Sequence, residues 1–248
     1  MSRSGCSQRD GLRGTVALVT GANRGLGREL VHALLRRGAG KVYAASRGDA
    51  EWTDRRVVPL RLDVTDPQQV AAAAQLAGDT VLLVNNAGVN RNRPLLGAPD
   101  LDGARAEMET NYFGTLAMCR AFAPVLRRNG GGCIVNVLSA AAHIGMPAMG
   151  SLCASKAAAL RLTECVRSEL AAQRTFVGAF LPSALETDMT RGLDVPKEQP
   201  QDAATALLDG LAEGMEEVWF GEGARRIRTR LFPATARVSA PEILATQR

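Results

Sequence analysis

The sequence predicts an α/β fold, a doubly wound parallel sheet of about seven strands with helices on both faces. From Thr15 onward, short runs of β-branched residues alternate with Ala- and Leu-rich segments of helical period. The short runs are apolar on both faces, which is typical of strands in a covered parallel sheet. A chain of 248 residues, 46% of them hydrophobic, is long enough for one such domain. We therefore predict a flexible leader over 1–14 and a single domain over 15–248.

The predicted strands follow one another along the chain as short apolar runs. They are TVALVT at 15–20, KVYAA at 41–45, VVPLRL at 57–62, TVLLV at 80–84, CIVNVL at 133–138, TFVGAFL at 175–181 and EEVWF at 216–220. Because parallel strands need crossovers, and these are right-handed, the segments between them are expected to be helices. In such sheets ligands bind beyond the carboxyl ends of the strands, so the residues that follow each strand are the candidate site.

Helices are predicted at 24–37, after Pro67, at 104–127 and at 152–172, and a further helix is expected about a dozen residues after Thr187. The tail after Phe220 is consistent with a terminal helix over the cleft or with a disordered end. Its arginines are expected to form a solvated surface; they are Arg225, Arg226, Arg228 and Arg230.

The composition argues against several classes of protein. The net charge is +5, but no long run of Lys or Arg is present, so nucleic-acid binding is not expected. No stretch of about 18 apolar residues occurs, so no membrane span is expected. The five cysteines stand singly, without metal-ligand spacing, which favours reduced thiols, a cytoplasmic location and no bound metal.

A glycine-rich turn follows the first predicted strand. Its sequence is TGANRGLG, in which the candidate phosphate-binding residues are Gly21, Asn23, Arg24, Gly25, Leu26 and Gly27. Glycines allow a tight turn and a close approach of the backbone, and the following helix N-terminus offers free N–H groups to an anion. The position between a strand and a helix predicts a Rossmann-type dinucleotide site.

The second predicted strand ends in Ser46 and Arg47, where an NAD site usually has a carboxylate for the ribose 2′-hydroxyl. A guanidinium suits a 2′-phosphate, and Arg24 in the glycine turn offers a second cation. The sequence therefore favours NADP(H) over NAD(H).

Together with NNAG at 85–88, Asn111, Ser139 and Lys156, this turn makes the chain resemble the short-chain dehydrogenase/reductase family over roughly 15–220. The resemblance implies that Asp63 and Val64 contact the adenine and that Asn86, Ala87 and Gly88 shape the floor of the site. It also implies that Pro182 and Thr187 hold the nicotinamide amide and that Lys156 binds the nicotinamide ribose. Dimers or tetramers that pair through the helices at 104–127 and 152–172 are expected on the same ground.

The family's chemistry uses Ser, Tyr and Lys with a helping Asn, which implies roles for Ser139, Lys156 and Asn111. Four residues before Lys156, where the tyrosine of YxxxK belongs, the sequence has Leu152. A leucine side chain has no proton to give, so another proton source is needed. We consider His143, which suits proton transfer by its ordinary pKa, and Ser139 acting through water.

Two further candidates for the proton source, Ser151 and Cys153, flank Leu152 but point elsewhere on the helix. The cleft is expected to be open and apolar, lined by Met146, Met149, Leu152 and Leu193, and suited to large or flat substrates. Three functions remain open. They are an NADP(H)-dependent carbonyl reductase acting on a bulky or aromatic small molecule, a lyase, isomerase or cyclase on the same scaffold, and a non-catalytic NADP(H)-binding partner.

Overall fold

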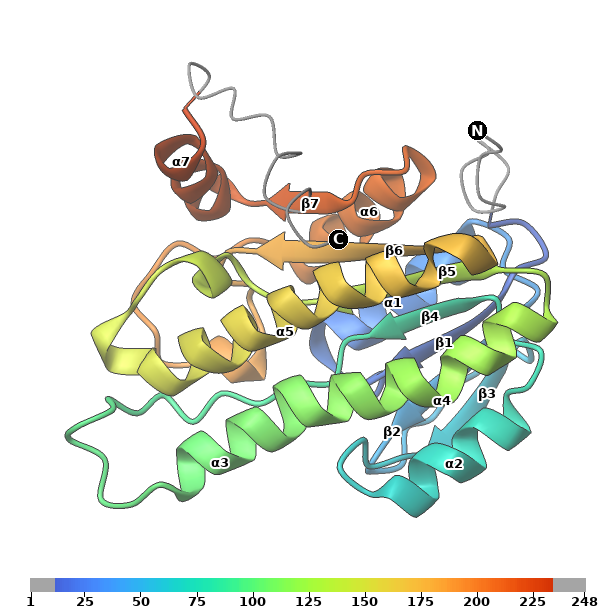
Figure 1. The fold of residues 1–248 in the computed structure, drawn as a ribbon, viewed down its shortest axis with the longest axis horizontal. Coiled ribbons are helices and arrows are strands. Elements are labelled where there is room, and N and C mark those ends of the chain that lie inside the picture. The colour runs from blue at the N-terminus through green and yellow to red at the C-terminus, as the bar shows by residue number, and fades with distance from the viewer. Residues whose placement is uncertain (1–11, 234–248) are drawn as a thin grey trace, which may run out of the picture.

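Seven strands form one parallel sheet in the computed structural model, which describes residues 12–233 (Figure 1). The order across the sheet is β3-β2-β1-β4-β5-β6-β7, and each neighbouring pair is parallel. The strands are β1 (Val16–Thr20), β2 (Lys41–Ser46), β3 (Val57–Arg61), β4 (Leu82–Asn85), β5 (Gly132–Val137), β6 (Thr175–Pro182) and β7 (Glu217–Phe220). The order reverses between β1 and β4, which confirms the doubly wound sheet.

Helices cover both faces of the sheet (Figure 1). One face carries α1 (Gly25–Arg36) and α6 (Pro200–Ala212), whose leucines are buried together against β1, β4 and β5. The other face carries α2 (Pro67–Leu76), α4 (Thr115–Arg128) and α5 (Gly150–Leu170). Both layers are apolar, and together they hold the strands so that all the carboxyl ends meet at one edge.

Short helices lie in the loops at this edge, namely η2 (Ala140–His143), η3 (Pro147–Met149) and η5 (Asp188–Thr190). Another short helix, η4 (Ala171–Gln173), lies at the opposite edge, between the end of α5 and the start of β6. After β7 the chain forms α7 (Glu222–Leu231), so the first of the two alternatives for the tail holds up to residue 231. The remaining residues of the tail, 234–248, lie outside the described residues.

The helix predicted at 104–127 is one continuous rod with an irregular middle. It consists of α3 (Asp102–Met108), the π-helical turn η1 (Glu109–Gly114) and α4. A π turn lengthens the hydrogen-bond spacing to i→i+5 and frees backbone groups at that point. Here the Thr115 hydroxyl donates to the Asn111 carbonyl at 2.9 Å, which satisfies one of them.

Two predicted boundaries shift. Strand β4 begins at Leu82 because the Thr80 N–H bonds the Ala77 carbonyl in the turn after α2. Leu12, predicted to lie in the flexible leader, is buried in the α1 face of the core, and the Thr15 N–H bonds its carbonyl. Ordered structure therefore begins before residue 15; residues 1–11 lie outside the described residues.

The cysteines follow the prediction in part. Cys119, Cys153 and Cys165 are free thiols, and burial raises the pKa of the Cys119 thiol to about 12. Cys133, on β5, is disulfide-bonded, so the prediction of a reduced thiol is wrong there.

Candidate active site

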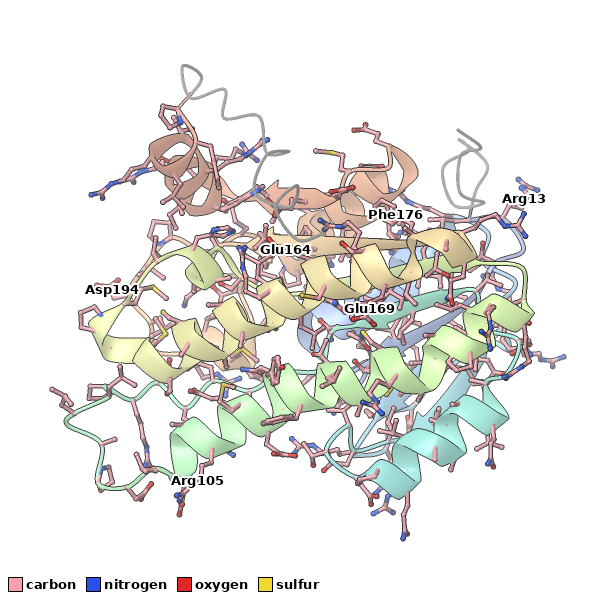
Figure 2. The ribbon with its side chains drawn as sticks, viewed as in Figure 1. Arg13, Arg105, Glu164, Glu169, Phe176 and Asp194 are labelled. Atoms are coloured by element: carbon pink, nitrogen blue, oxygen red, sulfur yellow. The ribbon has the colours of Figure 1, made fainter. Side chains whose placement is uncertain are left out.

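A cavity of about 1080 Å³ lies at the carboxyl edge of the sheet. Its walls come from the segments that follow β1 to β6, from the start of α5 and from the start of α7. In Figure 2 the labelled Asp194, which lines this cavity, lies at the end toward which the strands point, and Arg13 lies at the opposite end. The cavity is thus where a doubly wound sheet binds its ligands.

Most of the residues predicted for the site line this one cavity. They are Gly21, Asn23, Arg24, Gly25, Leu26, Gly27, Arg47, Asp63, Val64, Asn86, Ala87, Gly88, Ser139, Met146, Met149, Leu152, Lys156, Pro182 and Thr187. Among the predicted site residues, Asn111 and His143 do not line it.

The glycine turn after β1 has the shape that its sequence predicts. Gly21 and Gly25 have positive φ angles of 65° and 52°, which glycine adopts without strain. A Cβ on Gly27 would lie 2.1 Å from the Gly21 carbonyl oxygen, so no larger residue fits there. Helix α1 begins at Gly25, and Arg24 at its N-cap provides no side-chain hydrogen bond to the first N–H groups. These N–H groups remain available to an anion in the cavity.

Thr20 joins the glycine turn to the loop after β4, a role that sequence reasoning missed. Its buried hydroxyl accepts hydrogen bonds from the backbone N–H groups of Asn86 and Ala87 at 3.0 and 2.9 Å. The Asn86 side chain returns a hydrogen bond to the Thr20 carbonyl at 2.8 Å. The glycine turn and the loop after β4 are therefore joined as one rigid unit.

Two cations lie on the nucleotide side of the cavity. Arg47 follows β2, is exposed, and forms no ion pair with any residue that the structure describes. Arg24 is exposed and pairs with Asp188 across the cavity at 3.1 Å. Asp188 also pairs with Arg191. Arg47 is therefore the freer of the two to meet a 2′-phosphate.

The Asp63 carboxylate is engaged locally. It accepts hydrogen bonds from the N–H and the hydroxyl of Thr65 at 3.0 and 2.8 Å. These bonds fix the turn after β3 at the position that the family resemblance gives to the adenine.

The same cavity is also lined by Ser139, Leu152 and Lys156, which come from the loop after β5 and from α5. The Ser139 hydroxyl donates to the Pro182 carbonyl at 3.4 Å and accepts from the Ala141 N–H at 3.1 Å. Leu152 lies one helical turn before Lys156 on α5, as predicted. Lys156 is 8% exposed, and its ammonium donates to the Val137 carbonyl at 3.0 Å. Burial lowers the pKa of Lys156 to about 8.

Asn111 belongs to the frame of the site and not to its surface. Its side-chain amide donates to the Val89 carbonyl at 3.0 Å and to the Ser155 hydroxyl at 2.9 Å, and its oxygen accepts from the Val89 N–H at 2.9 Å. Because these bonds occupy the side chain, it is not free to contact a substrate. Asn111 lies in the π turn η1, and its side chain connects the loop after β4 to α5.

His143, considered above as a proton source, does not line the cavity, so the structure contradicts that role. Its ring centroid lies 4.8 Å from that of Trp219 and 6.0 Å from that of Phe232. Burial among these rings lowers the pKa of His143. Its neighbours Ala141 and Ile144 line the cavity instead, because the 3-10 turn η2 directs His143 toward β7.

The other two proposed proton sources are also absent from the cavity lining. Ser151 and Cys153 are buried on α5, but on either side of the face that Leu152 presents.

The wall beyond Leu152 is largely apolar. Its members include Ile144, Met146, Met149, Met189, Leu193 and Val195. Helix α7 completes the wall with Glu222, Gly223, Arg226 and Ile227. Sequence reasoning left this helix open and treated Arg226 as plain surface. The spacing of Ala224, Ile227 and Leu231 is the signal that indicates an amphipathic helix.

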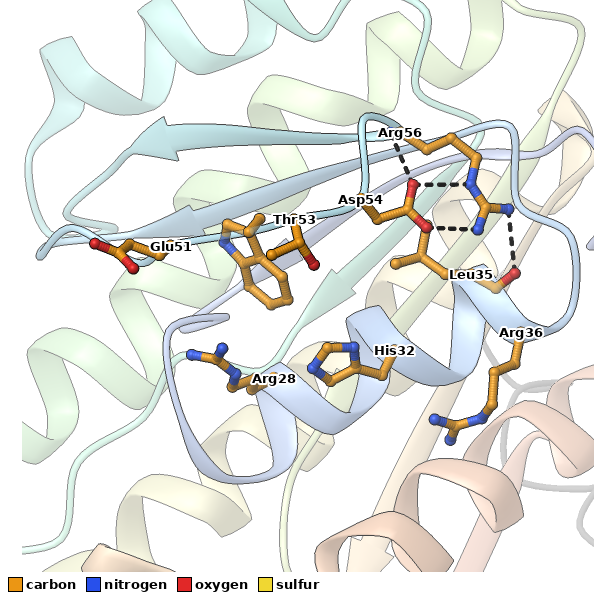
Figure 3. A pocket seen from close by; sticks show the side chains of 9 residues that line it. Arg28, His32, Leu35, Arg36, Glu51, Thr53, Asp54 and Arg56 are labelled. Carbon is orange, nitrogen blue, oxygen red and sulfur yellow. Dashed lines mark hydrogen bonds and ion pairs between the residues drawn. The ribbon is translucent and has the colours of Figure 1, made fainter.

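A second cavity, of about 340 Å³, lies between the outer face of α1 and the segment before β3 (Figure 3). Three of the charged side chains that line it contact groups of the protein. The Arg56 guanidinium binds Asp54 at 2.7 Å and the Leu35 carbonyl at 3.2 Å, and Arg28 lies over the Trp52 ring at 5.0 Å. It shares no lining residue with the larger cavity, and its bonds anchor the β2–β3 connection to α1.

Within residues 12–233, no three His, Cys, Asp or Glu side chains are grouped as metal ligands. The same part of the chain contains no helix with the length and apolar character needed to cross a membrane.

Solved structures of known proteins resemble this one closely. A short chain dehydrogenase from Burkholderia cenocepacia, solved in complex with NADP, is 50% identical and superposes with a TM-score of 0.87, over 90% of this chain and 94% of that one. A 3-ketoacyl-(acyl-carrier-protein) reductase from Brucella melitensis, complexed with NADH, is 26% identical with a TM-score of 0.75, over 83% and 93% of the two chains.

Sequence comparison leads to the same group. The chain is 32% identical over 212 residues to the 3-oxoacyl-acyl-carrier-protein reductase FabG of Vibrio harveyi, which covers 82% of this chain and 84% of that protein. It is 31% identical over 223 residues to the 7alpha-hydroxysteroid dehydrogenase of Escherichia coli, covering 79% and 87%. The family model described as short chain dehydrogenase matches residues 15–198. The chain therefore belongs to the short-chain dehydrogenase family of oxidoreductases.

Proposed function

We propose that this chain is an NADP(H)-dependent oxidoreductase that reduces the carbonyl group of a bulky, apolar or aromatic small molecule. The observation that carries the proposal is the single cavity that joins the glycine turn and Arg47 to Ser139 and Lys156. A nucleotide and a second molecule fit end to end only where both sets of residues face the same space.

The nucleotide half of the cavity suits NADP(H). At Gly27 the backbone leaves no space for a side chain, and the uncapped N-terminus of α1 suits a pyrophosphate. Arg47, with Arg24 beside it, suits the 2′-phosphate. The Burkholderia cenocepacia relative, half identical to this chain, binds NADP. When bound, NADP(H) supplies the hydride.

The other half suits a carbonyl substrate. Ser139 has its hydroxyl at the cavity surface, where it orients a carbonyl oxygen, the role that the family resemblance gives it. The methionines and leucines around Leu152 exclude water and accept an apolar body of variable shape. Two of the relatives, by their names, act on 3-oxoacyl groups and on a hydroxysteroid, which are substrates with large apolar parts.

Nucleotide binding tests the proposal first. Titration calorimetry with NADPH and with NADH should show tighter binding of NADPH. Replacing Arg47 by alanine should weaken NADPH binding by about 10- to 100-fold, the range of one charge-assisted contact, and leave NADH binding unchanged. Arg55→Ala is the control, because Arg55 is exposed before β3, at the edge of the sheet opposite to Arg47, and does not line the cavity. If neither nucleotide binds, the proposed function is wrong.

Leu152 favours a second candidate, a non-redox enzyme or an inactive NADP(H)-binding partner protein on the same scaffold. In the family pattern this position carries the tyrosine that protonates the carbonyl oxygen. The variant Leu152→Tyr separates the two functions. If the chain is an oxidoreductase, the wild-type protein should reduce ketones or quinones, and the variant should do so at the same or a higher rate. The rate is measured as the loss of NADPH absorbance. NADPH binding without any turnover in both proteins would favour the second candidate.

A further inference from the structure

If the chain reduces carbonyls as proposed above, a proton must reach the substrate oxygen without a tyrosine. We propose that Lys156 is this proton donor and acts as a catalytic residue, directly or through one water molecule. In the family pattern this lysine assists a tyrosine; here the position one turn away holds Leu152.

The geometry leaves the Lys156 ammonium free on the cavity side. One of its three N–H groups donates to the Val137 carbonyl at 3.0 Å, and no second acceptor for it lies within residues 12–233. A Cβ on Gly88 would lie 3.5 Å from Nζ, so the glycine keeps the space beside the ammonium open. Lys156 and Leu152 line the same cavity, and an isobutyl side chain leaves room that a phenol ring would fill.

The charged groups of the surrounding elements are engaged elsewhere. Glu107 of α3 is fully buried and accepts a hydrogen bond from the Arg91 N–H at 2.6 Å on one carboxylate oxygen, while the other oxygen has no hydrogen-bond partner among the described residues. Glu164 of α5 pairs with Arg161 at 2.7 Å. The two residues next to the Lys156 ammonium are uncharged: Val137 on β5 offers its backbone carbonyl, and Gly88 after β4 has no side chain. With no carboxylate beside it, burial alone lowers the pKa of Lys156 to about 8, close to the value that suits an acid at neutral pH.

The other proton sources are less well placed. His143 packs against Trp219, and neither Ser151 nor Cys153 lines the cavity. The Ser139 hydroxyl lies in the cavity, but its hydrogen-bond partners are the Pro182 carbonyl and the Ala141 N–H, so no acid is bonded to it that could replace a proton it gave up.

The step balances as follows in atoms and electrons. The carbonyl carbon of the substrate accepts a hydride from the reduced nicotinamide, and the carbon–oxygen π pair moves onto the oxygen. That oxygen takes a proton from Lys156 Nζ, so an O–H bond forms as an N–H bond breaks. The products are the alcohol, the oxidised nucleotide and a neutral Lys156 amine, which regains a proton from water.

Direct titration of the lysine tests the proposal without turnover. The sequence contains three lysines, Lys41, Lys156 and Lys197, so NMR of protein carrying ¹³C-labelled lysine gives three resolvable signals. The signal that disappears in Lys156→Arg should titrate near pH 8, about two pH units below an ordinary lysine. A midpoint in the ordinary range near 10 would overturn the proposal.

Turnover gives the second readout. Lys156→Arg keeps a cation for the nucleotide but cannot release its proton near neutral pH. We expect kcat to fall by about 10² to 10⁴, with NADPH binding retained in calorimetry. Adding Leu152→Tyr to this variant should restore part of the rate, because a phenol can then protonate the oxygen. Lys41→Arg, on β2 and paired with Asp79, is the control.

The pH dependence of wild-type kcat is the check that needs no variant. An acid must carry its proton to act, so kcat should fall as pH rises through the Lys156 midpoint found by NMR. A difference of more than about one pH unit between the kinetic midpoint and the NMR midpoint would overturn the proposal. Unchanged kcat in Lys156→Arg would overturn it while leaving the reductase function intact. A wild type that binds no NADPH or reduces no carbonyl would overturn both.

Discussion

Replacing Lys156 by methionine should raise the free energy of unfolding at pH 7. The methionine has similar length, so it fills the same space beside Leu152 without a charge. In the wild type Lys156 as a whole is 8% exposed, and its ammonium donates a hydrogen bond to the Val137 carbonyl. Burying a charge without a counter-ion costs free energy, and the lowered pKa measures that cost.

The magnitude follows from the two pKa values of Lys156. The ordinary value is 10.5 and the folded value is about 8. At 1.36 kcal/mol per pH unit, the difference corresponds to roughly 3 kcal/mol. Loss of the hydrogen bond to Val137 offsets about 1 kcal/mol, which leaves a gain of about 2 kcal/mol for the variant.

The sign with pH is also fixed. Below pH 8 both the folded and the unfolded chain hold the Lys156 proton, so their difference is constant. Between pH 8 and 10.5 the unfolded chain binds the proton that the folded chain has released, so wild-type stability rises with pH. Cys119 acts in the opposite direction above pH 9, because its folded pKa is raised. Its contribution cancels when wild type and variant are compared at the same pH.

Urea unfolding at pH 7, 8 and 9 measures this difference. The advantage of Lys156→Met should shrink by about 1 kcal/mol between pH 8 and 9, because half of the folded molecules have already released the proton at pH 8. Lys41→Met is the control, since Lys41 is paired with Asp79 and its pKa is raised. A Lys156→Met advantage that is independent of pH, or a variant less stable than wild type at pH 7, would refute the assigned cost of burial.

Three further predictions concern the nucleotide side. Thr20→Val should lower the free energy of unfolding by about 2–4 kcal/mol in urea, because two N–H groups of the loop after β4 lose their acceptor, whereas Thr20→Ser should retain most of the stability; equal stability of both variants would contradict this. Gly27→Ala should abolish NADPH binding in calorimetry and destabilise by about 1–3 kcal/mol or more, whereas Gly145→Ala, which has open space, should not. Asp188→Asn should change stability by less than about 1 kcal/mol, because its pair with Arg24 is exposed, yet tighten NADPH over NADH by releasing that cation; equal effects on both nucleotides would count against it.

The sheet and the glycine turn were predictable because their signals are local. Glycines within one turn and the apolar runs on either side fix the strand, the turn and the helix at 16–36 without reference to distant residues. Arg47 and Leu152 could be placed in the same way, by counting from a strand end or from Lys156. Their arrival in one cavity then follows from the parallel sheet, which brings all carboxyl ends to one edge.

What failed depended on long-range contacts. The orientation of His143 depends on Trp219, 76 positions later in the sequence. The imidazole packs against the Trp219 ring and not toward the cavity. The role of Asn111 depended on a π turn and on Val89 and Ser155, none of which periodicity reveals. The acceptor role of Thr20 likewise depended on a loop 66 residues away.

The separate origin of the two halves of the cavity has an evolutionary consequence. The residues proposed for the nucleotide come from the segments after β1 to β4 and after β6 and from Lys156, whereas Leu152, one turn before Lys156 on α5, is not among them. A mutation at Leu152 therefore changes the chemistry offered to a substrate without moving any group that holds the nucleotide. Such a scaffold can lose, recover or exchange a proton donor by single substitutions while selection for nucleotide binding continues, so related chains can diverge in reaction while sharing one coenzyme.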